Sequence, residues 1–357
     1  MVERMSELAD ELVVLAQPAD PEFVTQLKNV CGAEFIPTPL DRTGLNPLKD
    51  RGYRKQLSSF LEDFQPDHTF AFQAKAAMYS SIAAKRYPKI TTTVLFPGLG
   101  YLFSESGTLK DKVIRRLGWQ MYRYAFNKVD NFIFQNPDDI ETLVAAGIVK
   151  DRSKVNLVNG SGVPLEEYPF SPPVTKPIRF LFMGRLLWEK GVREFTDAAK
   201  RIRKEVSDEA EFQILGPLDS NPSAISKAEL DDVCESGGVE YLGVTQDVRP
   251  FLAKTSVFVL PSWYMEGTPR SILESMSMGR PIITADSRGC REPVEHGVNG
   301  FLVSPQDSGE LFEAMKRFIE KPDLLGSMGR ASREIAEDRY DVAKVNESIM
   351  SAMGLID

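Results

Sequence analysis

The chain of 357 residues is long enough to form two domains with separate hydrophobic cores. Its 42% hydrophobic and 26% charged residues are ordinary for a soluble globular protein and exclude a disordered or collagen-like class. The net charge of −8 argues against a nucleic-acid-binding protein, because such proteins neutralise phosphates with basic side chains. The three cysteines, Cys31, Cys234 and Cys290, are widely spaced and predict neither a disulfide framework nor a zinc site.

Membrane-spanning and secreted classes find no support in the sequence. No apolar run approaches the roughly 18–20 residues that a membrane span needs. The N-terminal sequence "MVERMSELADELVV" has acidic residues where a signal peptide needs a basic start and an apolar middle. We therefore expect a cytoplasmic protein, or one attached to a membrane only at its surface.

Short apolar segments alternate with helical segments in two series along the chain. The predicted strands, six in each series, are 11–16, 33–37, 68–72, 91–96, 131–135, 154–158, 178–184, 211–216, 239–243, 256–262, 281–286 and 300–305. Segments with helical periodicity separate most of them, as at 192–206 and 307–319. Strict alternation of strand and helix predicts parallel sheets that are covered on both faces.

A proline-rich segment separates the two series. The sequence "NGSGVPLEEYPFSPPVTKP" (159–177) holds five prolines and predicts a hinge between two doubly wound domains. We assign residues 1–170 to the first domain, 171–340 to the second, and 341–357 to a C-terminal helix that could return to the first. Ligands of such sheets bind outside the carboxyl ends of the strands, so two facing sheets predict a cleft between the domains.

The stretch "WYMEGTPRSILESMSMGRP" (263–281) predicts a helix that begins close to a strand end. Thr268 is the predicted N-cap, with Pro269 at the first helical position and Ser271 at the third. The unpaired N–H groups of the first turn predict an anion site, usually for a phosphate, because helix N-termini attract anions.

Two glutamates accompany this helix start. Glu274 is predicted on the same side as Arg270, one turn deeper, where its two oxygens can accept both hydroxyls of a ribose. Glu266 precedes the cap and would face whatever is attached beyond the phosphates. The simpler alternative is that Glu274 only pairs with a nearby base and that Glu266 is a solvated loop acid.

A second segment adds two cations at the same end of the sheet. The sequence "FMGRLLWEKG" (182–191) leaves a strand, turns at Gly184 and carries Arg185 and Lys190. Arginine binds phosphate oxygens with two parallel donors, and lysine supplies a mobile point charge. Together with the two glutamates, this segment predicts a bound anion between the strand end and the helix.

These segments resemble glycosyltransferase family 4, whose members are retaining enzymes of the GT-B fold. Glu266 and Glu274 match the E-x7-E motif of the family, "GRLLWEKG" matches its diphosphate-binding segment, and "GCREPVEHGVNGFLVSP" resembles the strand and turn that follow. Three further segments are similar to bacterial enzymes that extend glycans on undecaprenyl diphosphate: "FPGLGYLFSE" (96–105), "NFIFQNPDD" (131–139) and "NGSGVPLEEYP" (159–169).

The resemblance implies a role for each matched residue. Arg185 and Lys190 would hold the diphosphate of a UDP-sugar and neutralise the leaving group, a contribution of typically several kcal/mol to catalysis. Glu274 would bind the ribose hydroxyls, and Glu266 would contact the donor sugar. The other implied donor-binding residues are Gly184, Gly267, Thr268, Pro269, Arg270 and Ser271. The implied acceptor-side residues are Lys75, Gly98, Gly100 and Tyr101.

The implied reaction keeps the anomeric configuration, by same-face attack as UDP leaves, with a phosphate oxygen accepting the proton. This agrees with a sequence that has only two histidines, His68 and His296, both of which we interpret as structural. No Asp-x-Asp motif is present, and the two basic residues stand where a metal otherwise would. We therefore expect neither a metal nor a cofactor.

The N-terminus departs from the family pattern. Members begin with a strand, a loop that approaches the diphosphate, and a helix, whereas "MVERMSELAD" reads as the end of that helix. Met5, Leu8 and Leu12 would lie on one face, and the next strand follows at once. We expect the first strand of the sheet to be absent. Either the start codon is recorded too late or the gene is degraded, or residues 1–12 rearrange to fill the gap.

The segment "TLKDKVIRRLGWQMYRYAFNKVDNF" (108–132) interleaves basic and aromatic residues on a predicted helix. They are Lys110, Lys112, Arg115, Arg116, Arg123 and Lys128, with Trp119, Tyr122 and Tyr124. This pattern suits an anionic membrane surface. The alternative is a domain helix with a solvated basic face and buried aromatic residues.

The leading hypothesis is a retaining glycosyltransferase on the inner face of the cytoplasmic membrane. It would move a hexose or N-acetylhexosamine from a UDP-sugar to a polyprenyl-diphosphate-linked glycan in the synthesis of O-antigen, capsule or exopolysaccharide. A second hypothesis is a nucleotide-sugar-binding protein with little turnover, because its first domain is truncated. A GT-B epimerase fits less well, since a cleft with few histidines offers few acid–base groups.

Overall fold

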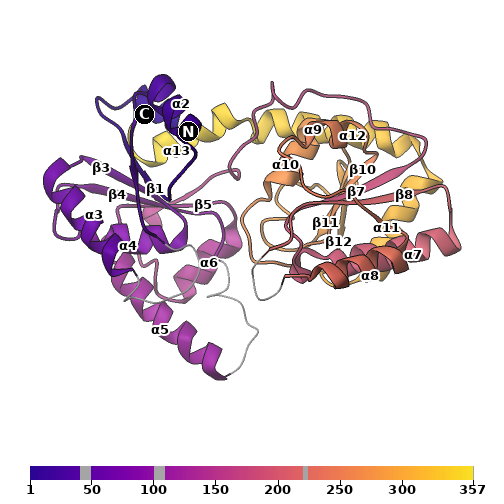
Figure 1. Cartoon of the computed structure of the whole chain (residues 1–357), viewed down its shortest axis with the longest axis horizontal. Coiled ribbons are helices and arrows are strands. Elements are labelled where there is room, and N and C mark those ends of the chain that lie inside the picture. The colour runs from indigo at the N-terminus through magenta and orange to yellow at the C-terminus, as the bar shows by residue number, and fades with distance from the viewer. Residues whose placement is uncertain (41–49, 100–108, 220–223, 357) are drawn as a thin grey trace. The chain divides into compact units, whose positions relative to one another are not determined.

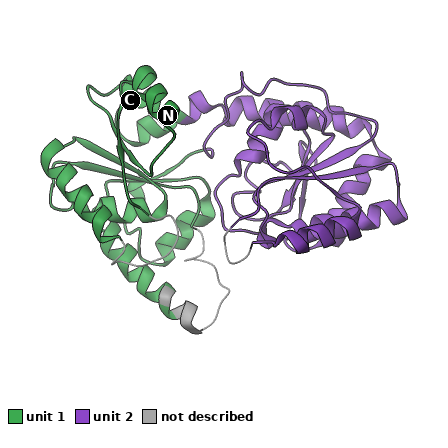
Figure 2. Ribbon diagram, in the orientation of Figure 1, with its two compact units in different colours: residues 1–158, 346–357 green, residues 159–345 purple. Residues whose placement is uncertain are grey.

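The computed structural model describes residues 1–40, 50–99, 109–219 and 224–356, with the side chains of 109–112 and 114 left aside. The chain divides into two compact units, residues 1–158 with 346–357 and residues 159–345 (Figure 2). Each of the twelve predicted strands is present, and no end differs from its prediction by more than two residues. The positions of the short apolar segments in the sequence were therefore sufficient to locate the strands.

Unit 2 is built on one parallel sheet of six strands. They are β7 (Arg179–Met183), β8 (Glu211–Leu215), β9 (Glu240–Tyr241), β10 (Val257–Leu260), β11 (Ile282–Ala285) and β12 (Gly300–Val303). Their order is β12-β11-β10-β7-β8-β9, and every pair is parallel. The order reverses between β7 and β10, and in open α/β sheets the ligand binds at such a switch point, outside the carboxyl ends of the strands.

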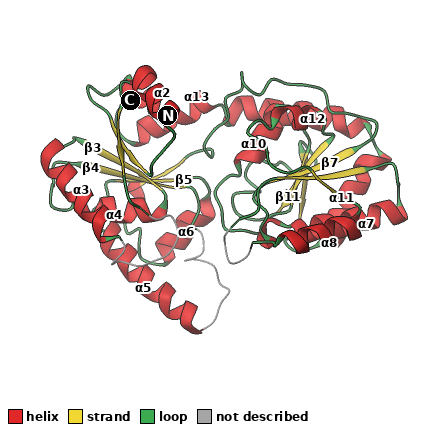
Figure 3. Cartoon of the chain, in the orientation of Figure 1, coloured by secondary structure: helices red, strands yellow, loops and turns green. Residues whose placement is uncertain are grey.

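Helices cover both faces of this sheet. They are α7 (Val192–Glu205), α8 (Lys227–Gly237), α9 (Arg249–Ala253), α10 (Arg270–Ser277), α11 (Ser308–Glu320) and α12 (Asp323–Arg339). Figures 1 and 3 show α10 and α12 along one face and α7, α8 and α11 along the other. In α7 the buried residues Val192, Phe195, Ala199 and Ile202 recur every three or four positions, which places them on one face of the helix. The sheet is thus buried on both sides, as predicted.

The described strands of unit 1 form two separate parallel sheets rather than one. The strands β1 (Val13–Ala16) and β2 (Glu34–Pro37) form a pair. The other sheet has the order β3 (His68–Phe72), β4 (Thr91–Phe96), β5 (Asn131–Phe134) and β6 (Val155–Leu157). Among the strands that the structure describes, none joins these two sheets by hydrogen bonds. The described strands of this unit therefore do not form one continuous sheet.

The first residues of the chain do not supply a strand to unit 1. Residues Val2–Ser6 form the short helix α1, which buries Met5, and residues 7–12 contain no strand. The suggestion that residues 1–12 rearrange to fill the sheet is therefore wrong as far as strand pairing is concerned. The physical reason is local, because the acidic and helix-forming residues of this stretch favour a helical turn.

Further helices complete unit 1. They are α2 (Pro21–Cys31), α3 (Arg51–Phe64), α4 (Ala74–Ala84), α5 (Leu109–Phe126) and α6 (Pro137–Ala145), with a 3-10 turn at Arg152–Lys154. The last helix, α13 (Val342–Ala352), begins in unit 2, and residues 346–357 belong to unit 1. Within unit 1, Arg4 Nε donates a hydrogen bond to Glu347 Oε1 at 2.7 Å, which ties this C-terminal segment to α1.

A fully buried arginine holds the proline-rich segment, with which unit 2 begins, against the rest of the unit. Arg280 is 0% exposed, and its guanidinium donates to the backbone oxygens of Thr255 and Met278 at 2.6 and 2.8 Å and to that of Ser171. Burial lowers the pKa of Arg280 to about 10. The side chain therefore joins the proline-rich segment, at the half-buried Ser171, to the interior of unit 2 through backbone carbonyl groups.

We expect the variant Arg280→Met to lower the free energy of unfolding by about 1–3 kcal/mol, since the buried carbonyl of Thr255 loses its donor, while that of Met278 keeps the amide of Ser171. In a unit of this size, the midpoint of thermal unfolding falls by about 2–4 °C per kcal/mol. Calorimetry of the full chain measures the shift. Lys227→Met is the matched control, because the Lys227 side chain is exposed and its pair with Asp231 lies at the surface. Equal melting temperatures for the two variants would contradict the role of Arg280.

Candidate functional site

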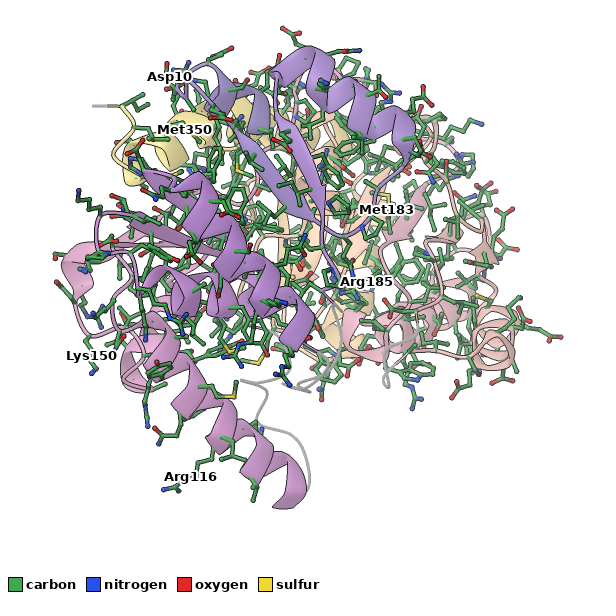
Figure 4. All side chains as sticks on the ribbon, turned by 60° about the vertical axis from the view of Figure 1, so that its left-hand side comes forward. Asp10, Arg116, Lys150, Met183, Arg185 and Met350 are labelled. Carbon is green, nitrogen blue, oxygen red and sulfur yellow. The ribbon has the colours of Figure 1, made fainter. Side chains whose placement is uncertain are left out.

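The predicted anion-binding residues lie in unit 2 at the switch point of the sheet. Gly184 directly follows β7, and Arg185 comes next, beyond Met183 (Figure 4). The 3-10 turn Trp188–Lys190 then leads into α7, and the loop that carries Glu266 follows the neighbouring strand β10. The sheet order therefore explains why segments about 80 residues apart in the sequence meet.

A glycine allows the turn with Lys190 to pack directly on the loop after β10. Gly191 has φ +85°, and a Cβ atom there would lie 2.4 Å from the carbonyl oxygen of Pro261. The backbone N–H groups of Trp263 and Tyr264 both donate to the carbonyl oxygen of Glu189, at 2.9 and 3.1 Å. This backbone contact fixes Lys190 against the loop that carries Glu266.

Lys190 and Glu266 form a partly buried ion pair. Lys190 is 6% exposed, and its Nζ donates to Glu266 Oε2. Ser262 Oγ donates to the other oxygen, Oε1, at 2.9 Å. Glu266 is therefore not the solvated loop acid of the simpler alternative. Both of its oxygens are held by donors from the ends of neighbouring elements.

Arg185 is oriented by an acid that the sequence analysis missed. Its Nη1 donates to Asp219 Oδ2 at 2.9 Å, and half of the arginine side chain is exposed. Burial opposes the charge, but the hydrogen bond and charge of Asp219, with smaller effects from Tyr264 and Glu266, raise the pKa of Arg185 above its ordinary value. Asp219 follows β8 at the same end of the sheet, so its position after a strand was the available signal.

Tyr264 links the two cations. Its ring centroid lies 5.8 Å from Lys190 Nζ and 6.0 Å from Arg185 Cζ, within the range of a cation–π interaction. The two positive groups therefore face one aromatic ring, although each also has its own carboxylate. This arrangement offers an incoming anion two cations on one side of the site.

The helix α10 begins one residue later than predicted. Its N-cap is Pro269, without a side-chain cap, so Thr268 is not the capping residue. The reason is the backbone of Pro269, whose ψ of 123° is extended and whose carbonyl accepts the amide of Ile272 at 3.0 Å. The backbone N–H groups of Arg270 and Ser271 still lie in the first turn of α10, and the N-terminus of a helix attracts anions.

Glu274 lies one turn into α10 and is 9% exposed. Its Oε1 accepts hydrogen bonds from Arg270 Nε at 2.9 Å and from the hydroxyl of Tyr168 at 3.2 Å. Burial raises the pKa of the Glu274 carboxyl above its ordinary value, and Arg270 and Tyr168 act against that shift. The pairing with Arg270 agrees with the simpler alternative, but Oε2 has no hydrogen bond among the residues that the structure describes.

The remaining predicted donor-side residue is Gly267, in the loop between Glu266 and α10. A neighbouring loop packs closely against Gly267. A Cβ atom on Gly289, where φ is +79°, would lie only 2.3 Å from the carbonyl oxygen of Gly267. That neighbouring loop belongs to the segment "GCREPVEHGVNGFLVSP". This segment therefore packs against the loop that carries Glu266.

The predicted acceptor-side residues belong to unit 1. Lys75, in the first turn of α4, pairs with the buried Asp50 at 2.9 Å, and the hydroxyl of Tyr79 donates to the same carboxylate at 2.9 Å. Gly98 follows β4. Gly100 and Tyr101 lie outside the described residues. The structure thus gives Lys75 a defined acidic partner that the sequence did not indicate.

His296 has a structural environment. Its Nδ1 accepts the backbone N–H of Leu302 at 3.1 Å, and its ring lies against Phe301 with centroids 5.6 Å apart.

Among the residues described, no group of three or more His, Cys, Asp or Glu side chains could hold a metal ion. In the same part of the chain, no helix has the length and apolar character required to cross a bilayer.

Solved structures identify the fold. The HepE protein of Anabaena, solved in complex with UDP, superposes with a TM-score of 0.76 and 20% identity over 99% of this chain and 95% of that chain. Sucrose-phosphate synthase of Thermosynechococcus elongatus superposes with a TM-score of 0.75 and 14% identity over 96% and 98%. The fold is GT-B, with two α/β units whose sheets are built from parallel strands.

Sequence comparisons match unit 2 to a family of domains and most of the chain to named relatives. Residues 177–321, within unit 2, match the family described as glycosyl transferases group 1. The chain is 28% identical to an N,N'-diacetylbacillosaminyl-diphospho-undecaprenol alpha-1,3-N-acetylgalactosaminyltransferase of Campylobacter jejuni, over 91% of this chain and 86% of that protein. It is 23% identical to the putative glycosyltransferase EpsD of Bacillus subtilis, over 88% and 83%. The chain is therefore a glycosyltransferase with a group 1 domain.

Proposed function

We propose that the chain transfers a hexose or N-acetylhexosamine from a UDP-sugar to a polyprenyl-diphosphate-linked glycan, with retention of the anomeric configuration. The observation that carries the proposal is the meeting of Arg185, Lys190, Glu266 and the start of α10 at the switch point of one sheet. The name of the Campylobacter relative, which refers to diphospho-undecaprenol, supports the lipid-linked acceptor. The UDP bound to the HepE protein supports the donor.

In this proposal the diphosphate lies between Arg185, Lys190 and the first-turn amides of α10. The two cations neutralise the charge that develops on UDP as the sugar leaves, and such fixed electrostatic groups typically contribute several kcal/mol. The Glu274 carboxylate accepts the ribose hydroxyls, and Glu266 contacts the donor sugar. The acceptor hydroxyl attacks from the face that UDP leaves, and a phosphate oxygen takes its proton. The cation pair supplies the positive charge, so we propose neither a metal nor a cofactor.

One observation favours a second candidate, a nucleotide-sugar-binding protein with little turnover. The strands described in unit 1 fall into two sheets, while those described in unit 2 form one sheet from β12 to β9. A nucleotide sugar could therefore bind to unit 2 without an acceptor site in unit 1. Measurement of UDP binding alone cannot separate the two candidates, since both retain Arg185, Lys190 and Glu274.

The deciding experiment offers UDP-, GDP- and ADP-sugars together with a short polyprenyl-diphosphate sugar. We expect transfer from a UDP-sugar, detected by mass spectrometry, with retention observed by NMR of the product. Binding of UDP without transfer or hydrolysis would favour the second candidate. Failure to bind any of the three nucleotides would contradict both.

The helix α5 of unit 1 offers a surface for the membrane in which such an acceptor is anchored. Among the side chains of α5 that the structure describes, the exposed ones follow one face, and they are Val113, Arg116, Leu117, Gln120 and Tyr124. The side chain of Arg116 extends away from unit 1 (Figure 4). In contrast, Tyr122 is buried, and Arg123 Nε donates to the carbonyl of Ala146 at 2.7 Å. Apolar residues beside an exposed arginine suit an anionic lipid surface, and we place the enzyme on the inner face of the cytoplasmic membrane.

We expect the double variant Arg115→Glu and Arg116→Glu to lose most of its binding to anionic vesicles, because each basic residue near such a surface contributes about 1 kcal/mol. Flotation with phosphatidylglycerol-containing vesicles at low and high salt measures the loss. The matched control reverses two charges on another exposed face of unit 1, with Arg51→Glu and Lys55→Glu on α3. Equal binding by the two double variants would remove α5 from the proposal.

A further inference from the structure

Tyr168 reaches the candidate ribose-binding carboxylate from the proline-rich segment. This residue lies ten positions after Val158, the last residue of the first stretch of unit 1, and it packs against the hydrophobic core of unit 2. Its hydroxyl donates to Glu274 Oε1 at 3.2 Å. Its backbone carbonyl accepts Ser277 Oγ, one turn further along α10, at 2.8 Å. Tyr168 is therefore attached to α10 both through its side-chain hydroxyl and through its backbone carbonyl.

A second helix secures the same residue. Arg333 of α12 donates from Nη1 to the carbonyl of Tyr168 at 2.9 Å and to that of Ser277 at 2.8 Å. The Arg333 guanidinium is itself held by Glu337, whose Oε1 accepts from Nε at 2.6 Å. Because the backbone of Tyr168 is fixed by two helices, its hydroxyl has a defined position relative to Glu274.

The two donors to Glu274 differ in how firmly they hold it. The Arg270 side chain is 61% exposed, so solvent screens its charge and competes for its hydrogen bond. Tyr168 is partly buried and anchored through its backbone, and burial together with the Glu274 charge raises the pKa of its hydroxyl to about 12. The hydroxyl therefore keeps its proton at neutral pH and remains a donor.

We propose that Tyr168 is a positioning residue for the donor nucleotide, whose hydroxyl holds Oε1 of Glu274 so that Oε2 remains available to a ribose hydroxyl. A carboxylate has acceptor sites on both oxygens, and a donor fixed on one oxygen restricts the rotation of the group. The inference rests on the proposed role of Glu274 in ribose binding. It adds a residue that acts through Glu274 and does not itself touch the nucleotide.

The test is a double-mutant cycle between Tyr168→Phe and Glu274→Gln in the full chain. Calorimetry measures the Kd of UDP and of its 2′,3′-dideoxy analogue, which lacks both ribose hydroxyls. We expect Tyr168→Phe to weaken UDP binding by about fivefold to tenfold, since a hydrogen bond to a charged group is lost while the ring packing remains. In the Glu274→Gln background, and for the dideoxy analogue, we expect Tyr168→Phe to change the Kd by less than about twofold, since residues that act through one another are not additive.

Tyr340→Phe is the matched control. Tyr340 is 2% exposed within the core of unit 2, so this variant removes a buried phenol hydroxyl away from Glu274. We expect both single tyrosine variants to remain folded and to melt only a few degrees below the parent, and only Tyr168→Phe to weaken UDP binding. In the transfer assay, Tyr168→Phe should raise the KM for the donor with little change in kcat.

Two results would overturn the proposal, and they are distinguishable. If UDP binds more tightly than the dideoxy analogue, but Tyr168→Phe weakens both ligands equally or adds fully to Glu274→Gln, Tyr168 has only a structural role. If the parent chain binds UDP and the dideoxy analogue equally well, the ribose role of Glu274 fails, and the inference fails with it.

Discussion

Replacing Lys190 with methionine is expected to lower the rate constant of sugar transfer by roughly 10²–10³-fold, the usual effect of removing one group that stabilises developing negative charge. The Lys190 side chain is 8% exposed, so its ammonium group acts in a medium that screens charge less than water does. Methionine is close to lysine in length and has a similar apolar stem, but it lacks the ammonium group and therefore both the charge and its hydrogen bond to Glu266. The effect should appear in kcat at saturating donor concentration, because the charge on the diphosphate grows as the bond breaks.

Two controls separate this effect from loss of folding. Lys190→Met leaves Glu266 without its cation, so the combined variant with Glu266→Gln should recover the melting temperature while transfer stays low. Lys204→Met changes the same charge on the exposed end of α7 and should leave transfer unaffected. A folded Lys190→Met protein with kcat within about threefold of the parent would show that Lys190 does not stabilise the leaving group.

The variant Glu266→Gln is expected to change binding and catalysis in opposite directions. In the unliganded unit, Glu266 neutralises Lys190, so a diphosphate must compete with this carboxylate for the cation. Glutamine is similar in size and can still accept the hydrogen bond of Ser262, but it carries no charge. We therefore expect UDP to bind about threefold to tenfold more tightly, which corresponds to roughly 0.7–1.4 kcal/mol. Transfer should decrease, since the contact of Glu266 with the sugar is altered.

Salt dependence provides the check on this mechanism. The gain in UDP affinity should diminish as ionic strength rises, because its origin is the removal of a charge close to the diphosphate. Glu205→Gln, at the exposed end of α7, removes the same charge outside the site and should leave the Kd of UDP unchanged. Weaker binding of UDP by Glu266→Gln would mean that Glu266 supports the nucleotide and does not compete with it for Lys190.

The positions of the strands and of the main site residues followed from local patterns. A buried parallel strand needs a short apolar run, and a helix that covers the sheet needs apolar residues every three or four positions, so both can be recognised within a few residues. The ends of β7 and β10 therefore placed Arg185 and Glu266 near the same edge of the sheet. The start of α10 was one residue in error, because the choice between Thr268 and Pro269 depends on a backbone dihedral angle that composition does not determine.

The partners of these residues were decided only by the tertiary structure. Asp219 meets Arg185 because β8 lies beside β7, and Tyr168 meets Glu274 from 106 positions away. In the same way, the division of unit 1 into two sheets depends on which strands pair, and alternation of strand and helix does not specify that pairing. The sequence alone determined the elements and the kind of chemistry at their ends, since those depend on neighbouring residues. Long-range contacts depend on how distant segments pack, and so they were visible only in the folded chain.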